Sequence, residues 1–341
     1  MEPRKHKTVF VSVRSARHRQ AALQAAPDVL DVVLLFQPSP PELRRHLAGA
    51  EFLISERRGR IDADLLRAAP GLRLVLRLGS LWYDIDLPAA SEAGVAVCWW
   101  PLGGVIRVAE HVVLQMLALG KRLTESTAVA QEAGPHWGPS RRTDENTFAY
   151  NWTNRQDLHG LWQKTVGILG FGEIGVELAR RLAGWGCTVL YHKRHRLPEA
   201  VEARLGIRFS DRAQIFSDSD YVVNLLPYSP DTDLSLGRAD FARMKPGAYL
   251  VSCGSGSVID ETALAEFIRR GRLAGAALDT FEWEPLRPDN PLLVLARQGG
   301  NVLLTPHIAA GDTAAAAEER RQMYTPVLRF LAGEPVPNRL V

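Results

Sequence analysis

The stretch from Thr165 to Gly175, TVGILGFGEIG, decides the fold of this chain. An apolar run of strand type leads into three glycines with the spacing GxGxxG, and a helix-like segment, Val176–Ala183, follows directly. A lone GxGxxG is a weak signal, but the order strand, glycine turn and helix is the one that binds dinucleotides in parallel α/β domains. The stretch therefore predicts a dinucleotide site on a doubly wound sheet.

Each glycine of this turn has a separate physical task. Gly170 would make the tight bend, and Gly172 would let the backbone approach a pyrophosphate. Gly175 would let the helix pack closely on the strand. The first amides of the helix, beginning with Glu173 and Ile174, would then face the anion. We predict that these five residues bind the cofactor.

The residues that follow the next strand indicate which dinucleotide is bound. A site that prefers NAD has Asp or Glu about 20 residues past the glycines, where it accepts hydrogen bonds from the ribose hydroxyls. Lys193 occupies that place here, and Arg194 follows it. Cations at this position suit a 2′-phosphate, because charge-assisted hydrogen bonds to it need donors. We expect NADP(H) in preference to NAD(H), with NAD(H) as the alternative.

The rest of the chain alternates short apolar runs with amphipathic segments, which predicts parallel α/β architecture throughout. The predicted strands are 8–13, 31–36, 51–54, 72–76, 95–99, 165–169, 188–191, 221–225, 249–252, 274–278 and 301–304. An almost wholly apolar helix is predicted over 105–119, and such a helix is usually buried between domains or in a dimer interface. Residues 124–163 are interpreted as a long ordered loop. The tail, 313–331, is predicted to be one amphipathic helix kinked at Pro326.

Composition narrows the class of protein further. A chain of 341 residues is long enough for roughly two domains, and 46% hydrophobic with 23% charged residues is ordinary globular composition. A net charge of +3 gives no electrostatic case for binding nucleic acid or an anionic membrane. The sequence contains no run of about 18 apolar residues, so no membrane span is predicted. Three cysteines cannot form a disulfide framework, so we expect a cytoplasmic protein.

Three later segments resemble the D-isomer-specific 2-hydroxyacid dehydrogenase family. They are RGRLAGAALDTFEWEP (270–285), NVLLTPHI (301–308) and SCGSGSVIDE (252–261). Upstream, Val108–His111 looks like the start of the hinge helix of that family, and Leu78–Ser80 looks like its substrate loop. The resemblance covers nearly the whole chain. It implies a substrate-binding flavodoxin-like domain over 1–103 and 309–341, a Rossmann domain over 104–308, and a cleft between the two.

Reduction of a 2-oxo acid needs a hydride donor, a proton donor for the new alkoxide and an anchor for the substrate. His307 follows a strand and a proline, so its ring should lie at the carboxyl edge of the sheet, where such sites are found. A histidine is the natural proton donor near neutral pH. Glu284 would hold the imidazole in one tautomer. The resemblance assigns the same roles to His307 and Glu284.

The resemblance also implies the remaining contacts of the site. Asp279 is similar to the acceptor for the nicotinamide carboxamide in this family. Further cofactor contacts are expected at Pro227, Cys253 and Gly254. Gly79 and Ser80 are expected to contact the substrate.

The most consequential departure from the family is at Ser255, where its members carry a catalytic Arg that binds the carbonyl and carboxylate of the substrate. A hydroxyl donates one neutral hydrogen bond in place of two charged ones, and loss of such a donor costs on the order of 10²–10³ in rate. Either the substrate is not a standard 2-oxo acid, or another cation substitutes, or the site no longer catalyses. Arg58 and Arg107 are the candidates for substitution.

The sequence thus predicts an NADP(H)-dependent oxidoreductase that acts on a small 2-hydroxy or 2-oxo acid or a related carbonyl compound, as a homodimer without bound metal. The alternative is a cofactor-sensing binding protein without turnover, similar to the transcriptional corepressor branch of the family. Ser255 supports that alternative, and the retained His307 and Glu284 oppose it.

Overall fold

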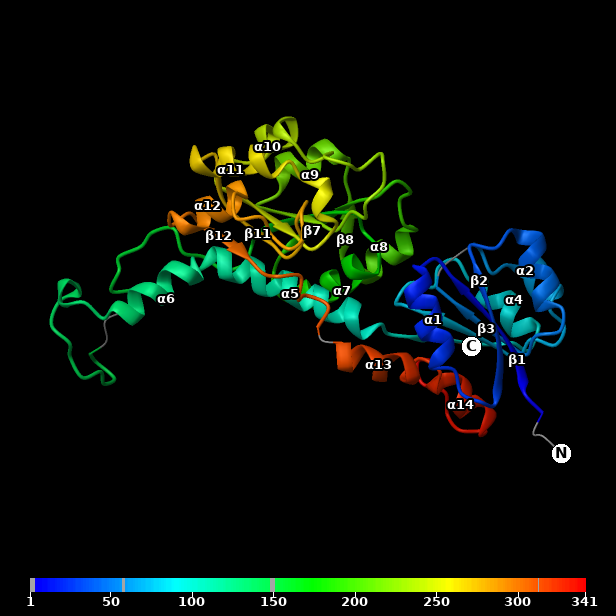
Figure 1. The fold of residues 1–341 in the computed structure, drawn as a ribbon. Helices are drawn as coiled ribbons and strands as arrows, with labels where there is room; N and C mark the ends of the chain where they lie inside the picture. Colours follow the sequence, from blue (N-terminus) through cyan, green and yellow to red (C-terminus); the bar gives the residue numbers. More distant parts are fainter. Residues whose placement is uncertain (1–3, 57–58, 148–150, 312) are drawn as a thin grey trace. The chain divides into compact units, whose positions relative to one another are not determined.

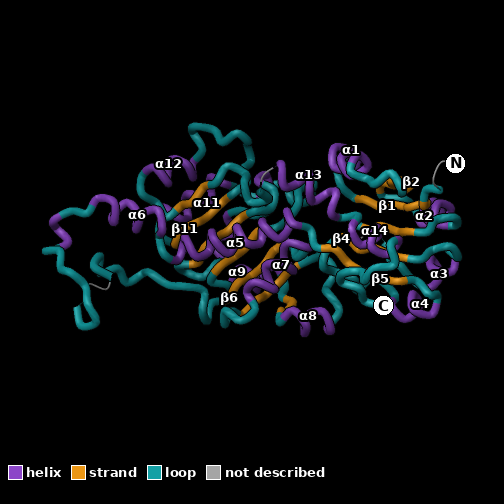
Figure 2. The backbone as a smooth tube through the Cα atoms, turned by 90° about the horizontal axis from the view of Figure 1, so that it is seen from below, coloured by secondary structure: helices purple, strands orange, loops and turns teal. Residues whose placement is uncertain are grey.

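The computed structural model describes residues 4–341 except 57–58, 148–150 and 312; the side chains of 313 and 314 are also outside the description. The chain divides into two compact units. Residues 1–107 and 310–341 form the first, called here the N-terminal unit, and residues 108–309 form the second, called the inserted unit. Each unit is built around its own sheet (Figures 1 and 2).

The N-terminal unit contains a five-stranded sheet in the order β2-β1-β3-β4-β5, with every neighbouring pair parallel. The strands are β1 (His6–Ser12), β2 (Leu30–Phe36), β3 (Phe52–Ser55), β4 (Leu74–Leu78) and β5 (Ala96–Trp100). These are the five strands predicted from the sequence, displaced by at most two residues at each end. The doubly wound order places the carboxyl ends of all five strands at one edge.

Helices cover both faces of this sheet. They are α1 (Ala16–Gln24), α2 (Pro40–Leu47), α3 (Ala63–Arg67), α4 (Leu87–Glu92), α13 (Thr313–Gln322) and α14 (Thr325–Leu331). Leu47 of α2 and Leu66 of α3 pack on one face. Ala22 of α1 and Val327 of α14 pack on the other, so the end of the chain completes the core of its beginning.

The inserted unit contains a seven-stranded parallel sheet in the order β12-β11-β10-β9-β6-β7-β8. Its strands are β6 (Thr165–Leu169), β7 (Thr188–His192), β8 (Ile207–Phe209), β9 (Tyr221–Asn224), β10 (Ala248–Ser252), β11 (Leu273–Leu278) and β12 (Val302–Leu304). Six of the seven were predicted, and the three-residue β8 was not. Two parallel α/β units confirm the predicted fold class.

Helices lie on both faces of this sheet (Figure 1). They are α7 (Glu173–Leu182), α8 (Glu199–Leu205), α9 (Arg212–Asp218), α10 (Arg238–Arg243), α11 (Glu261–Arg269) and α12 (Pro291–Arg297), with short 3₁₀ turns at Pro135–Trp137 and Gly256–Val258. Helix α6 (Leu123–Glu132) extends away from the sheet and has no buried residue (Figure 1). A large core cluster joins α9, α10, α11 and α12 to the strands.

Helix α5 (Gly103–Gly120) runs from the first unit into the second. By length and composition it is the one helix in the described ranges that could cross a membrane. Val108, Val112 and Met116 of α5 are nevertheless buried within the protein. Partial burial of this kind is typical of a core helix.

Two sequence predictions about irregular segments are wrong. The stretch 124–163 is not a loop from its start, because α6 occupies Leu123–Glu132. Arg122 has a left-handed φ of 46°, so it ends α5 and allows a second helix to begin. The tail is two helices, α13 and α14, and not one kinked helix. Pro326 lies in the first turn of α14, where its missing N–H costs nothing.

Candidate active site

The glycine turn after β6 has the geometry that a dinucleotide requires. Gly170 has a φ of 81°, and a Cβ on it would lie 2.7 Å from the carbonyl carbon of Leu225. A Cβ on Gly175 would lie 2.8 Å from the ring of Phe171. A Cβ on Gly172, by contrast, would meet no atom within 4 Å. Two glycines are therefore needed for packing, and the third leaves open space at the N-terminus of α7, where a pyrophosphate would bind.

The chain after β7 carries cations and no free carboxylate. Arg196 pairs with Glu202 (Nη2 to Oε2 2.8 Å), and the hydroxyl of Tyr191 donates to the same carboxylate at 2.6 Å. The hydrogen bond from Arg196 lowers the pKa of Glu202. Arg194 is exposed and forms no ion pair with any residue of the described ranges. Arg194 is thus available to an anion, and Lys193 lies beside it at the end of the strand.

Asp279 lies buried at the end of β11 and organises the segment that follows β12. The hydroxyl of Thr305 donates to its Oδ1 at 2.6 Å. The backbone amides of Ile308 and Ala309 donate to Oδ1 and Oδ2 at 3.0 and 2.9 Å. The Nε2 atom of His111, from α5, lies 3.0 Å from the hydroxyl of Thr305. One carboxylate therefore fixes the backbone on the C-terminal side of His307.

His307 and Glu284 form a hydrogen-bonded pair within this unit. The Nδ1 atom of His307 lies 2.8 Å from Oε2 of Glu284. The other carboxylate oxygen of Glu284 accepts the backbone amide of Phe281 at 3.1 Å, which orients the carboxylate. His307 has a left-handed φ of 55°, unusual for a residue with a side chain, and its side chain is 60% exposed. Such a backbone is retained where the surrounding structure requires it, often at functional sites.

The loop that carries Glu284 is held by a second, buried carboxylate. Glu261, at the start of α11, accepts the backbone amide of Glu282 at 3.1 Å and the side-chain amide of Asn290. Burial raises the pKa of Glu261, and the structure shows no cation paired with it in the described ranges. The first amides of a helix favour a negative charge, which offsets part of the cost of burial. Glu261 thus closes the loop 282–290 at both ends.

The turn that contains Ser255 is hydrogen-bonded to the chain after β9 and closely packed. The backbone amide of Ser255 donates to the carbonyl oxygen of Leu226 at 2.9 Å. A Cβ on Gly256 would lie 2.0 Å from the backbone of Phe281. The thiol of Cys253 donates to Oε1 of Gln115 at 3.4 Å, and burial raises the pKa of that thiol. A buried neutral thiol of this kind is not a nucleophile.

The other predicted site residues lie in both units. Pro227 is exposed beyond the end of β9, and Gly254, next to Ser255, accepts the hydroxyl of Thr280 at 2.6 Å. Gly79 and Ser80 follow β4 in the N-terminal unit, and Gly79 has a φ of 111°.

The two candidate cations differ in what the structure records of them. Arg107 donates to the carbonyl of Ala310 at 2.6 Å and pairs with Glu319, so it is engaged inside the N-terminal unit. Its substrate role stays a prediction. Arg58 lies outside the described residues.

Comparison with known proteins settles the family. The model of the D-isomer specific 2-hydroxyacid dehydrogenase NAD binding domain matches residues 136–309. This chain belongs to the D-isomer-specific 2-hydroxyacid dehydrogenase family. The resemblance inferred from the motifs is therefore confirmed.

Two curated relatives and one solved structure illustrate the range of this dehydrogenase family. Glyoxylate/hydroxypyruvate reductase B of Yersinia pestis is 36% identical over 303 residues, 89% of this chain and 86% of the relative. D-3-phosphoglycerate dehydrogenase of Archaeoglobus fulgidus is 30% identical over 313 residues, 91% of this chain. The chain spans 55% of that relative, about half its length. The crystal structure of the PH0520 protein from Pyrococcus horikoshii OT3 covers 100% of this chain and is itself covered to 95%, with 27% identity and a TM-score of 0.58.

Sequence reasoning missed three residues that support this site: His111, Thr305 and Glu261. Each lies inside a motif that was quoted for the resemblance, so its position was visible. The partners were not, because His111 and Thr305 are separated by 194 residues. A buried carboxylate with only amide partners leaves no charge pattern in the sequence.

Proposed function

We propose that this chain is an oxidoreductase that transfers a hydride between NADP(H) and a 2-oxo or 2-hydroxy acid or a related carbonyl compound. The observation that carries the proposal is the 2.8 Å contact between His307 and Glu284, with an exposed imidazole at the carboxyl edge of the sheet. Family membership supports a nicotinamide cofactor.

The residues of the inserted unit fit each part of such a reaction. When bound, the nicotinamide supplies the hydride that reduces the carbonyl carbon. Glu284 occupies Nδ1 of His307, so Nε2 is the nitrogen left to give its proton to the carbonyl oxygen. In the oxidative direction the same nitrogen takes the hydroxyl proton. Glu284 stabilises the imidazolium at that stage, as the carboxylate does in a Ser-His-Asp triad.

A preference for NADP(H) over NAD(H) rests on the end of β7. Arg194 lies there without a carboxylate partner among the described residues, and the nearby Glu202 already accepts from Arg196 and Tyr191. A 2′-phosphate at this position would meet the exposed guanidinium of Arg194, whereas a ribose with free hydroxyls lacks the Asp or Glu acceptor of an NAD site.

The substrate anchor is the part of the family mechanism that this chain alters. Ser255 has a hydroxyl where the family has a guanidinium. Arg58 and Arg107 remain candidates for the missing cation. Arg287 is a third, because it follows Glu284 by three residues and its guanidinium lies 4.9 Å over the ring of Trp283. A guanidinium stacked in this way keeps its in-plane N–H groups free for a carboxylate.

The serine at position 255 also favours a second function. With Ser255 in place of the anchoring Arg, the protein would bind cofactor and not turn over a 2-oxo acid, as a sensor does. The intact pair of His307 and Glu284 favours the enzyme over the sensor.

Two further proposals concern the assembly and the compartment. Leu114 on the largely apolar helix α5 is 52% exposed, and an exposed leucine there favours a homodimer contact along this helix. Cys98, Cys187 and Cys253 are all free thiols, in keeping with the reducing cytoplasm.

One experiment separates the enzyme from the sensor. The purified protein is offered glyoxylate, hydroxypyruvate, pyruvate and larger 2-oxo acids with NADPH and with NADH, and cofactor oxidation is recorded beside direct cofactor binding. Oxidation of NADPH supports the enzyme. Binding of NADPH without oxidation on any substrate supports the sensor. If Ser255→Arg gains activity on glyoxylate or hydroxypyruvate, the proton relay of the natural chain is intact.

A further inference from the structure

The N-terminal unit has a second place where its topology favours a ligand, apart from the proposed function of the inserted unit. The strand order β2-β1-β3-β4-β5 reverses direction between β1 and β3. Ligands of open α/β sheets bind beyond the carboxyl ends of the strands at such a switch point. The residues at this point are Ser12, at the end of β1, and Glu56, just after β3.

A buried polar cluster lies at this switch point. Glu56 has a side chain that is 5% exposed, and it accepts the hydroxyl of Ser12 at 2.5 Å. Nε2 of His18, on α1, lies 3.2 Å from its other oxygen, and Nε of Arg14 lies 3.3 Å from that oxygen. Both oxygens of the carboxylate are therefore occupied. Glu56 thereby fixes His18 at the start of α1.

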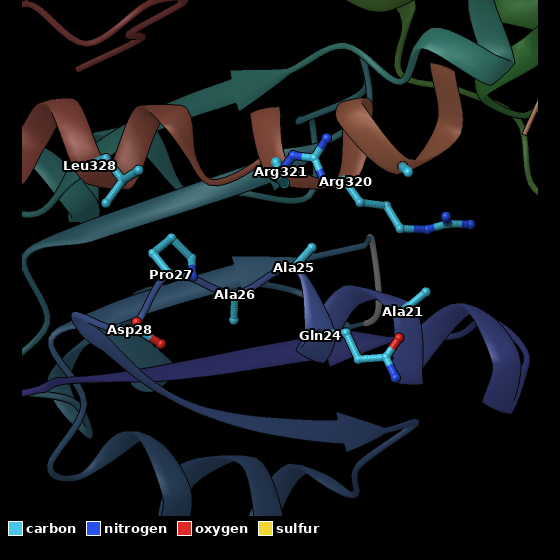
Figure 3. Close-up of a pocket in the computed structure, with 10 residues that line it drawn as sticks. Ala21, Gln24, Ala25, Ala26, Pro27, Asp28, Arg320, Arg321 and Leu328 are labelled. Atoms are coloured by element: carbon cyan, nitrogen blue, oxygen red, sulfur yellow. The ribbon is translucent and has the colours of Figure 1, made fainter. Parts of the chain in front are cut away.

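A cavity of about 630 Å³ opens beside this cluster, between α1 and α13. Its polar lining comes from Ser15, Arg17, His18, Gln20, Gln24 and Arg320. A neighbouring cavity of about 600 Å³ shares Gln24 and Arg320, so the two form one groove. Figure 3 shows the second part, with Gln24 on one wall and Arg320 on the other.

More cationic than acidic side chains line this groove. The segment from Val13 to Gln24, VRSARHRQAALQ, contains three arginines and a histidine and no acidic residue. Within the described part of the chain, neither Arg17 nor Arg320 forms an ion pair or hydrogen bond. Of the acids of α13, Glu318 pairs with Arg321, which lines the neighbouring cavity, and Glu319 pairs with Arg107. Asp28 is the acidic residue that lines the neighbouring cavity.

We propose that this groove is an anion-binding site, and that it takes the phosphate group of a small phosphorylated ligand. Arg17 of α1 and Arg320 of α13 line the same cavity, and a tetrahedral anion bound there can accept charge-assisted hydrogen bonds from guanidinium groups. The N-terminus of α1, a helix of nine residues, adds backbone amides and a favourable dipole. His18 contributes a ring held in place by Glu56. Gln24 provides a neutral donor for the rest of the ligand.

The test is calorimetric titration of the full-length protein with sodium phosphate and with sodium pyrophosphate, using sodium chloride at matched ionic strength as the reference. The test variant is Arg17→Gln/Arg320→Gln. The control variant is Arg208→Gln/Arg243→Gln, which removes the same charge from exposed, unpaired positions of the inserted unit. We expect phosphate to bind the natural chain and the control alike, and the test variant to bind about tenfold or more weakly because two charged donors are lost.

Two more readouts separate this site from the dinucleotide site and from misfolding. The ring resonances of His18 should shift on addition of phosphate, and NADPH should bind the test variant as it binds the natural chain. Equal phosphate affinity in the test and control variants would overturn the proposal, as would an effect that chloride reproduces at equal ionic strength. Stronger binding of pyrophosphate than of phosphate would identify a diphosphate ligand, and the reverse order a monophosphate.

Discussion

The two sheets of this protein have the same parallel construction, but their carboxyl edges are organised in different ways. In the inserted unit the edge is prepared by backbone: Gly170 bends the chain, and Gly172 leaves space at the start of α7. In the N-terminal unit the corresponding edge is filled by side chains around the buried carboxylate of Glu56. A site formed by backbone can be recognised in the sequence from the spacing of its glycines. A site formed by side chains can be recognised only in the tertiary structure.

The comparison would be broken most severely at His307, the proposed proton donor at the edge of the inserted unit. We expect His307→Gln to lower kcat by about 10²–10⁴, because general acid catalysis is lost while the cofactor turn is untouched. Steady-state rates and NADPH binding measure the two effects separately. His46→Gln, on α2, is the control. A variant at 307 that keeps full turnover would remove His307 from the mechanism.

The backbone character of the inserted edge is tested by Gly170→Ala. A non-glycine residue in the left-handed region costs roughly 1–2 kcal/mol from φ alone. Gly170→Ala should lower the free energy of unfolding by more than that, because the added Cβ would lie 2.7 Å from the carbonyl carbon of Leu225. Gly184→Ala is the matched control, since Gly184 has a φ of 84° and open space around it. Chemical unfolding measures both, and equal losses of stability would contradict the packing argument.

The contribution of the Glu56 carboxylate to the stability of the N-terminal edge is tested by Glu56→Gln, measured at several pH values. Burial acts to raise the pKa of Glu56, but hydrogen bonds from His18 and Ser12 outweigh it, so the pKa lies below its ordinary value. The carboxylate therefore stabilises the fold at neutral pH, and this contribution is lost as the pH falls through the lowered pKa.

We accordingly expect Glu56→Gln to lower the free energy of unfolding by about 1–3 kcal/mol at neutral pH. The difference from the natural chain should shrink in acid, where Glu56 is protonated. Urea unfolding across the pH range measures this, with the exposed Glu92→Gln as control. A loss that is independent of pH would mean that packing, and not charge, makes Glu56 stabilising.

The smallest expected effect concerns the adenosine end of the cofactor. Arg194→Ala should weaken NADPH binding about tenfold, because an exposed charge-assisted hydrogen bond is worth roughly 1.4 kcal/mol. NADH, which lacks the 2′-phosphate, should bind as before. Fluorescence titration with both cofactors measures the ratio. Parallel weakening of both would show that Arg194 does not read the phosphate.

The sequence allowed most of the inserted edge to be predicted, and the structure explains why. The strand at 165–169 was placed with its observed bounds, because an apolar run and a glycine spacing mark both its ends. His307 and Glu284 were paired from their motifs. Helix α6 was missed because the segment 124–163 was interpreted as one unit. Its glycines and prolines after residue 133 indicate a loop, although its first ten residues favour a helix.

The polar cluster at the N-terminal edge could not be predicted from the sequence. Glu56 and Ser12 are 44 residues apart, and no motif links them to His18. Their association depends on β1 and β3 pairing in parallel, with Val11 opposite Ser55. Tertiary pairing of this type can be inferred as a topology, but the side chains that it brings together depend on the register.

The most direct test of the central claim follows the hydride itself. NADPH labelled with deuterium at C4 of the nicotinamide is incubated with the protein and the 2-oxo acid that gives the fastest cofactor oxidation, and the product is analysed by mass spectrometry and chiral chromatography. The account predicts deuterium on C2 of a D-2-hydroxy acid, formed about 10²–10⁴ more slowly by His307→Gln. Bound NADPH that releases no deuterium to any 2-oxo acid would contradict it.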